Sequence, residues 1–168
     1  NQLENAIDIQ VEAAKAIGCR VVLARGSMSL GREHGGLPPS QTVQCARTIM
    51  EDSERVIKKF HDRGSGALVQ IALAPCSPFS VSQELMKSTA ELAKELDVRL
   101  HTHLAETEDE ETFCLQRFGL RPVEYLEQAG WLNSGTWVAH GIHFNQEEIA
   151  QLGSCLLYTS PSPRDSSK

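Results

Sequence analysis

Two histidines and a glutamate lie close together in the segment Val-Arg-Leu-His-Thr-His-Leu-Ala-Glu, residues 98–106. The apolar residues of this segment predict a short strand, and residues two apart on a strand project from the same face. His101 and His103 should therefore share a face, while Glu106 follows the strand end, where a turn can bring it back over the same place. Imidazole and carboxylate groups at a strand end are suited to holding a metal ion and moving a proton.

A second short apolar segment also carries histidines at its end, with the sequence Val-Ala-His-Gly-Ile-His at residues 138–143. It adds His140 and His143 to the candidate residues. Each histidine has an ordinary alternative as a packed side chain that binds a backbone carbonyl, and Glu106 has one as an acidic residue favoured at a helix start. The acidic run at residues 106–111 lacks the glycine and the alternation of a calcium loop, so we interpret it as the solvated start of a helix.

The segments that must position these side chains alternate between strand and helix. Near-continuous apolar runs predict strands at residues 19–24, 68–74, 98–104 and 136–139. Helical spacing of apolar residues predicts helices at residues 1–18, from a cap at Ser40 or Thr42 to about residue 63, from a cap at Ser82 to residue 96, at 108–118 and 122–129, and from a cap at Asn145 onward. Residues 25–40, rich in Gly, Ser and Pro, predict a long loop.

This alternation indicates an α/β fold with a parallel sheet. A doubly wound sheet and a (β/α)₈ barrel both fit the pattern. No Gly-x-Gly-x-x-Gly follows a strand, which weakens the dinucleotide-binding form of the doubly wound sheet. Polar clusters follow the carboxyl ends of the strands, where barrel enzymes build their sites. Because a whole barrel takes about 250 residues, we predict an internal half, about four β/α units, of a TIM-type barrel.

Composition limits the class of partner. The formal net charge of −6 does not favour a nucleic acid or an anionic membrane as partner, because both need clustered Lys and Arg. The sequence has no apolar run long enough to cross a bilayer. The 5 cysteines form no Cys-x-x-Cys pair and no disulfide framework, which is typical of a reduced, cytoplasmic protein.

The last part of the chain differs in composition from the rest. From Cys155 the sequence reads Cys-Leu-Leu-Tyr-Thr-Ser-Pro-Ser-Pro-Arg-Asp, and it resembles the in-frame translation of a transposon-type sequencing adapter. We therefore expect residues 1–153 to form the partial barrel and residues 154–168 to be a non-native tail that is extended or makes few contacts. The sequence begins and stops within predicted helices, which predicts that the chain is an internal piece of a longer enzyme.

Four motifs together resemble the amidohydrolase superfamily, in the branch of cytosine, guanine, adenosyl-nucleoside and triazine hydrolases. His-Leu-Ala-Glu-Thr at residues 103–107 resembles the fifth-strand motif, and Ala-His-Gly-Ile-His at 139–143 resembles the sixth-strand motif. Ala-Pro-Cys-Ser-Pro-Phe-Ser at 74–80 resembles the end of the fourth strand. Residues 25–29 and 35–39 resemble the loop after the third strand.

The resemblance implies roles for individual residues. In this family a His-x-His pair, a further histidine and an aspartate hold one divalent metal, usually zinc. His103 matches the further histidine, while the His-x-His pair and the aspartate would lie outside this chain. Glu106 matches the carboxylate that carries protons, and His140 matches a histidine that orients the attacking group or joins the metal shell. Arg25, Ser27 and Cys76 are the expected substrate contacts, with Cys76 lining the pocket rather than acting as a nucleophile.

The implied function is a metal-dependent aminohydrolase that deaminates an oxidised purine, 8-oxoguanine, to urate and ammonia. A metal lowers the pKa of bound water to near 7, and one carboxylate can move protons to the ring nitrogen and to the leaving amine. A triazine or guanine aminohydrolase with the same metal site, and a non-catalytic α/β binding domain, remain as alternatives. We expect a small-molecule substrate and no nucleic-acid or membrane partner. The sequence leaves open whether the full-length protein is a homo-oligomer. We expect the piece alone to be inactive.

Overall fold

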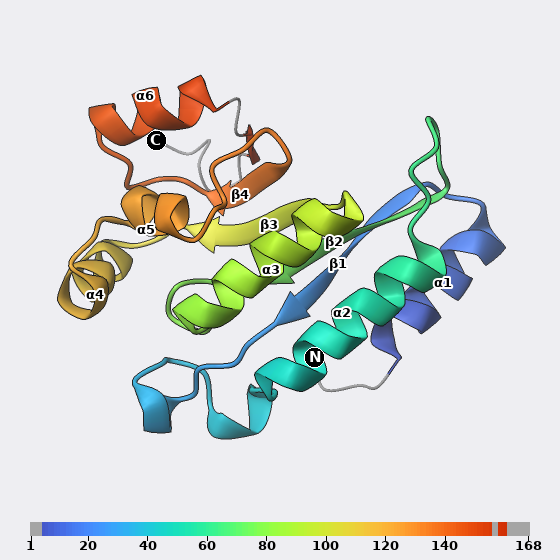
Figure 1. The fold of residues 1–168 in the computed structure, drawn as a ribbon, viewed down its shortest axis with the longest axis horizontal. Coiled ribbons are helices and arrows are strands. Elements are labelled where there is room, and N and C mark those ends of the chain that lie inside the picture. The colour runs from blue at the N-terminus through green and yellow to red at the C-terminus, as the bar shows by residue number, and fades with distance from the viewer. Residues whose placement is uncertain (1–4, 156–157, 161–168) are drawn as a thin grey trace.

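A sheet of five parallel strands forms the centre of the molecule, in the order β1-β2-β3-β4-β5 (Figure 1). The computed structural model describes residues 5–155 and 158–160. The strands are β1 (Val21–Ser27), β2 (Val69–Pro75), β3 (Arg99–Leu104), β4 (Thr136–His140) and β5 (Tyr158–Ser160). Because neighbours in the sheet are also consecutive along the chain, all carboxyl ends lie at one edge, which is the arrangement of part of a barrel.

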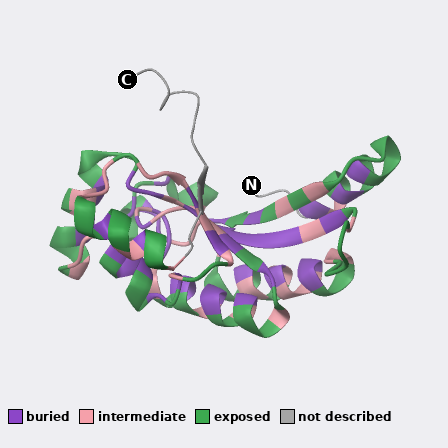
Figure 2. Ribbon diagram, turned by 90° about the horizontal axis from the view of Figure 1, so that it is seen from above, coloured by how far each residue is buried: buried purple, intermediate pink, exposed green. Residues whose placement is uncertain are grey.

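Helices connect consecutive strands, and α2 and α3 lie side by side along one face of the sheet (Figure 1). The helices are α1 (Ala6–Ile17), α2 (Ala46–Phe60), α3 (Gln83–Leu96), α4 (Glu108–Phe118), α5 (Pro122–Gln128) and α6 (Gln146–Ser154). Two short 3₁₀ turns, Arg32–His34 and Ser40–Thr42, lie in the loop between β1 and α2. Buried residues concentrate along the strands and on the helix surfaces that face them (Figure 2).

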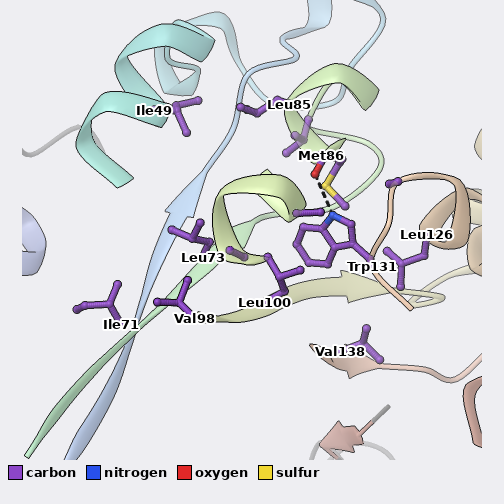
Figure 3. Close-up of a cluster of buried hydrophobic side chains, with 14 of the residues drawn as sticks. Ile49, Ile71, Leu73, Leu85, Met86, Val98, Leu100, Leu126, Trp131 and Val138 are labelled. Atoms are coloured by element: carbon purple, nitrogen blue, oxygen red, sulfur yellow. Dashed lines mark hydrogen bonds between the residues drawn. The ribbon is translucent and has the colours of Figure 1, made fainter. Parts of the chain in front are cut away.

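The core lies between the helices and one face of the sheet (Figure 3). Trp131, fully buried, packs among aliphatic side chains of α3, α5 and the strands, and its Nε1 donates a hydrogen bond to the carbonyl of Met86 at 3.0 Å. The other face of β1 stays open, since Val22, Ala24 and Gly26 are exposed. In a barrel this open face is the interior, and His101 and His103 of β3 lie on it.

Most expected elements are confirmed. The four predicted strands are parallel and adjacent in chain order, and the caps at Ser82 and Asn145 accept hydrogen bonds from the amides of Leu85 and Glu148. The predicted helix cap at Ser40 or Thr42 is wrong, because these residues form a separate 3₁₀ turn and α2 begins at Ala46. Strand β1 also runs to Ser27, further than expected, which matters for the site below.

One part of the expected tail pairs with the sheet. The segment Tyr158–Ser160 forms β5 and pairs with residues 137–139 of β4. This segment is extended, as one of the two expected alternatives has it, but its pairing is more than few contacts. The pairing uses the backbone of β4, whose edge is otherwise open. Any extended segment can pair with an open strand edge, since the hydrogen bonds come from the main chain. Residues 156–157 and 161–168 of the expected tail lie outside the described residues.

Candidate active site

The carboxyl ends of β3 and β4 bring three of the predicted site residues together. His101 and His103 pair in register with Trp137 and Ala139, so all four side chains share the open face of the sheet. The ring centroids of His103 and His140 are 5.4 Å apart. His140 Nε2 lies 3.6 Å from Glu106 Oε1. The expected cluster of His103, Glu106 and His140 is therefore present, while the roles of its members stay predictions.

His140 reaches this cluster through an unusual backbone conformation. In the sheet His140 pairs with Leu104, whose side chain is buried on the helix-covered face. Regular alternation would send the His140 side chain to that face as well. However, His140 has φ 71° and the following Gly141 has φ 67°, both in the left-handed region that non-glycine residues rarely adopt. This turn at the end of β4 places the imidazole beside His103.

A second left-handed residue precedes Glu106. Ala105, at the end of β3, has φ 52°, which turns the chain away from the strand direction before Glu106. The turn is held from two sides. The Ala105 carbonyl accepts hydrogen bonds from the amides of Ile142 and His143 at 3.0 and 3.1 Å. On the other side, the carboxylate of Glu110 binds the amides of Ala105 and Glu106.

Glu110 is the site residue that the sequence analysis missed. We interpreted residues 106–111 as a solvated helix start, but the Glu110 side chain is buried, with 1% of its surface exposed. Burial raises the pKa of this carboxyl to about 7, although the hydrogen bonds from the amides of Ala105 and Glu106 act to lower it. The pattern Thr-x-x-Glu at residues 107–110 is a capping-box signature, and it could have indicated a glutamate that reaches back to earlier amides.

The partners of His103 leave one ring nitrogen free for a metal. Nδ1 lies 2.8 Å from the carbonyl oxygen of Cys76. Because a carbonyl only accepts hydrogen bonds, Nδ1 carries the proton, and in the neutral ring the lone pair is on Nε2. A ligating histidine typically donates its other ring N–H to such an acceptor, which fixes its orientation. His103 therefore fits the role of a metal ligand through Nε2.

The Cys76 side chain also acts on His103. Sγ lies 4.0 Å from Nδ1, and this contact, followed by the Cys76 carbonyl, raises the pKa of His103 to about 9 although burial opposes it. The same contact lowers the pKa of the Cys76 thiol. No base lies near Cys76 along the sequence, and the pairing of β2 with β3 brings His103 beside it. A metal must displace the second proton of His103, so binding should strengthen as the pH rises.

Within residues 5–155 and 158–160, no group of three or more His, Cys, Asp or Glu side chains is arranged to hold a metal ion. His101 stacks on Trp137 with ring centroids 4.7 Å apart, and its Nδ1 lies 3.1 Å from the Trp137 carbonyl oxygen. Burial lowers the pKa of His101. These contacts favour a packing role for His101.

The prediction that Arg25 contacts the substrate needs correction. Because β1 continues to Ser27, alternation along the strand places Arg25 on the helix-covered face, in register with Leu73. Its Nε donates to Asp52 Oδ2 at 2.9 Å, and a terminal nitrogen donates to Gln44 at 3.2 Å. The guanidinium is 7% exposed. Arg25 thus joins β1 to α2 and faces away from His103.

Ser27 and Cys76 have different surroundings. Ser27 is buried on the same face as Arg25, and its carbonyl accepts a hydrogen bond from the Cys76 amide at 3.0 Å. Burial on this face does not favour the substrate contact predicted for the Ser27 side chain, which stays a prediction. Cys76 itself lines a pocket of about 450 Å³. The other residues of this pocket, all but Thr42 within the motifs at 25–29, 35–39 and 74–80 but without a predicted role, are Met28, Leu37, Pro38, Pro39, Thr42, Ser77, Phe79 and Ser80.

Backbone hydrogen bonds between two loops shape this pocket. The amide of Leu37 donates to the Phe79 carbonyl at 3.0 Å, and the amides of Ser29 and Leu30 donate to the Ser80 carbonyl at 2.9 Å. Gly36 fits between the loops because a Cβ there would lie 2.1 Å from the Leu30 carbonyl oxygen of its own loop and 2.9 Å from the Phe79 carbonyl oxygen of the other. The pocket is thus formed by the fold itself, next to the residue that contacts His103.

Comparison with known proteins adds to this geometry. Residues 1–158 match the model of the Amidohydrolase family. Over 151 residues the chain is 66% identical to 8-oxoguanine deaminase from Pseudomonas aeruginosa, covering 90% of this chain and 34% of that protein. It is 34% identical over 148 residues to hydroxydechloroatrazine ethylaminohydrolase from Pseudomonas sp., covering 88% and 30%. The chain thus spans about a third of the length of these curated relatives.

A solved structure with the same fold contains a metal. The crystal structure of atrazine chlorohydrolase from Arthrobacter aurescens TC1, complexed with zinc, superposes with a TM-score of 0.89 at 31% identity. The superposition covers 93% of this chain and 34% of that one. The fold is therefore that of a partial barrel of this type.

Proposed function

Because the chain belongs to the amidohydrolase family, we propose that it is part of a metal-dependent aminohydrolase that converts 8-oxoguanine and water to urate and ammonia. The observation that carries the proposal is the convergence of His103, Glu106 and His140 at the carboxyl ends of β3 and β4. The identity of 66% with an 8-oxoguanine deaminase supports the substrate. The activity belongs to the whole protein, of which this chain supplies one side of the site.

His103 is the proposed metal ligand of this chain, through Nε2, with the remaining ligands on parts of the barrel outside it. A divalent metal, for which zinc is the proposed identity, supplies hydroxide near neutral pH when it is bound. The zinc in the structure of the atrazine chlorohydrolase supports this identity. The Cys76 carbonyl orients His103 by accepting the hydrogen bond from Nδ1.

Glu106 is the proposed proton carrier. Deamination adds water across a ring C–N bond and then breaks the bond to the exocyclic amine, so a proton must reach first the ring nitrogen and then the leaving nitrogen. A single carboxylate within hydrogen-bond reach of both can accept the proton from the attacking water and deliver it. Glu106 is exposed on the open face and close to His140. His140 is the proposed partner that orients the attacking group.

The proposed site of the purine ring is the pocket beside Cys76. Its walls include Leu37, Pro38 and Phe79, which suit a flat ring. The hydroxyls of Thr42 and Ser80 donate to the carbonyls of Pro39 and Ser77, so toward a substrate they offer acceptors for a ring N–H. The corrected position of Arg25 removes it from this role. A small molecule is thus the proposed partner.

A triazine hydrolase is the second candidate, because the atrazine chlorohydrolase shares the fold at a TM-score of 0.89. Sequence identity favours the purine, since it is 66% with the 8-oxoguanine deaminase and 34% with the ethylaminohydrolase. A guanine aminohydrolase and a non-catalytic α/β domain have less support, the latter because packing does not require two left-handed strand ends that converge on one cluster.

The test uses a complete barrel. We suggest the full-length protein that contains this chain, or a chimera in which residues 1–153 replace the matching segment of the Pseudomonas aeruginosa 8-oxoguanine deaminase. Ammonia release would be measured with 8-oxoguanine, guanine, cytosine and hydroxyatrazine, and metal content in parallel. We expect 8-oxoguanine to be turned over fastest, with about one metal per barrel. Preference for hydroxyatrazine would overturn the substrate only, and no activity on any of the four would overturn the proposed function.

Two further expectations stay proposals. No helix in the described part of the chain is long and apolar enough to cross a membrane, and we propose a cytoplasmic enzyme. We also propose that residues 154–168 derive from a sequencing adapter, with β5 formed by backbone pairing on the open edge of β4. The natural gene should then encode a different sequence after residue 153, and recovery of the same residues from an unfragmented gene would contradict this.

A further inference from the structure

We infer that Glu110 is a positioning residue for proton transfer: its carboxylate holds the turn that places Glu106 beside His140. The inference rests on the proposed function, because it assumes that Glu106 carries the proton. No family resemblance assigns a role to Glu110, and the neighbouring acidic residues Glu106, Glu108 and Asp109 are exposed.

Both oxygens of the Glu110 carboxylate are used. Oε1 accepts a hydrogen bond from the amide of Ala105 at 2.8 Å, and Oε2 accepts one from the amide of Glu106 at 3.2 Å. These two amides come directly after β3, which ends at Leu104. Glu110 sits in the first turn of α4, so the helix carries the carboxylate back to the strand end.

The turn at Ala105 needs such support. A left-handed conformation is unfavourable for alanine and persists only where the surroundings impose it. Glu110 binds the Ala105 amide from one side, while the amides of Ile142 and His143 bind the Ala105 carbonyl from the other. Gly141, next to His140, also donates to the Leu104 carbonyl at 3.0 Å. The positions of Glu106 and His140 are therefore fixed through one shared peptide segment.

A carboxylate suits this place better than an amide. It offers two acceptor oxygens to two N–H donors, whereas glutamine of the same shape offers one oxygen and one NH₂ group. In Glu110→Gln, one backbone amide would face a donor instead of an acceptor, although the volume of the side chain hardly changes. The substitution therefore tests the hydrogen bonds with little change in packing.

The experiment measures kcat, KM, metal content and thermal unfolding of the complete barrel at pH 8. We expect Glu110→Gln to lower kcat on the order of 10²-fold, as misplacement of a reacting group by about 1 Å can do. KM and metal content should stay close to those of the parent. Loss of metal, a rise in KM alone, or unchanged kcat would each overturn the inference.

Glu148→Gln is the matched control. Glu148 is also a buried glutamate in the first turn of a helix, with 4% of its surface exposed, and it accepts a hydrogen bond from the Asn145 amide at 2.9 Å. Glu148 lies in α6, outside the proposed machinery. We expect Glu148→Gln to lower the melting temperature while leaving kcat unchanged. If it lowers kcat as much as Glu110→Gln does, a general structural effect explains both and the inference fails.

A double variant tests whether Glu110 acts through Glu106. If it does, Glu106→Gln combined with Glu110→Gln should be no more than about twofold slower than Glu106→Gln alone, because coupled residues are not additive. Multiplied losses would overturn the inference while leaving the proposed function intact. Parental turnover in Glu106→Gln would overturn the role of Glu106 as well.

Glu110→Asp keeps the test open if the glutamine variant does not fold. Aspartate retains the charge but is one methylene shorter, so it reaches at most one of the two amides. We expect a smaller loss of kcat than in Glu110→Gln, again without a change in KM. Parental kcat in folded Glu110→Asp supports the inference if the Ala105 and Glu106 amides keep their parental protection from hydrogen exchange. Parental kcat with both amides unprotected overturns the inference.

Discussion

Carboxylates in two regions of the molecule have opposite surroundings. In the first region, between α1 and α2, Asp8 accepts hydrogen bonds from both terminal nitrogens of Arg55 at 3.0 and 2.8 Å and from Lys59 at 2.8 Å. Arg55 foremost, together with Lys59, holds the pKa of Asp8 well below its usual range. In the second region, at the end of β3, backbone amides take the place of the cations around Glu110, and burial raises its pKa to about 7.

Carboxylates in the first region join elements of the fold, whereas those in the second lie where we propose the chemistry. Asp52 extends the first region by binding Arg55 and Arg25, so the carboxylates there are neutralised by cations and join α1, α2 and β1. At the ends of β3 and β4, by contrast, a buried carboxylate, an exposed carboxylate and two histidines lie together, and in the described part of the chain neither carboxylate is paired with an Arg or Lys side chain. Perturbed ionisable groups in this arrangement are typical of functional sites. The two regions should therefore respond differently to substitution.

The largest contrast should come from Glu106 and Asp52. Glu106→Gln keeps the shape but removes the acid–base group, which should lower kcat about 10²–10⁴-fold in the complete barrel with little change in unfolding. Asp52→Asn should lower stability and leave kcat unchanged. Steady-state ammonia release and urea unfolding of both variants would check this. Equal losses of kcat would show that the two regions do not differ as described.

His103 should differ from its neighbour His101. Loss of a group that is hydrogen-bonded to a metal ligand typically weakens metal binding roughly 10–100-fold. His103→Ala removes a proposed ligand itself, so it should weaken metal binding by more than this, and activity should fall with the metal content. His101→Ala removes the stacking on Trp137 and should retain the metal. Metal titration followed by elemental analysis measures both effects. Full metal occupancy in His103→Ala would remove it from the proposed ligand set.

The pH dependence of stability should have opposite signs in the two regions. A carboxyl whose folded pKa is raised stays protonated in the folded state, so Glu110 costs stability as the pH rises from its ordinary value of 4.5 to about 7. The full effect is on the order of 3 kcal/mol, from about 1.4 kcal/mol per pKa unit. Urea unfolding of the metal-free protein between pH 4.5 and 8 would measure it. The slope should disappear in Glu110→Gln, and an unchanged slope would contradict the assignment.

Asp8 should show the smaller effect, with the reverse sign. Its lowered pKa means that its contribution is present above the ordinary value of 3.8 and is lost as the pH falls toward the folded pKa. Asp8→Asn should lower the free energy of unfolding by about 1.5 kcal/mol at pH 8, as for a hydrogen bond to a charged group. Ammonia release should stay at the parental rate. Chemical denaturation at low salt and at about 0.5 M salt, where exposed ion pairs are screened, would distinguish an ionic contribution to stability from a packing contribution.

The sequence by itself determined the local elements and the strand ends that carry the site. Apolar runs and helical spacing predicted four parallel strands, and the motifs at residues 103–107 and 139–143 placed His103, Glu106 and His140 at their carboxyl ends. These features are local, because strand periodicity and turn residues act over a few positions. Local periodicity placed the end of this strand at residue 24, whereas β1 continues to Ser27 and so turns Arg25 to the helix-covered face.

Only the tertiary structure decided which groups face one another. The left-handed turns at Ala105 and His140, which hydrogen bonds between the ends of β3 and β4 hold, and the contact of the Cys76 carbonyl with His103 depend on the register between strands. The Arg25–Asp52 pair likewise joins elements far apart in the sequence. Such contacts form between segments that no local pattern relates, because chain alternation fixes the direction of a side chain but not its partner.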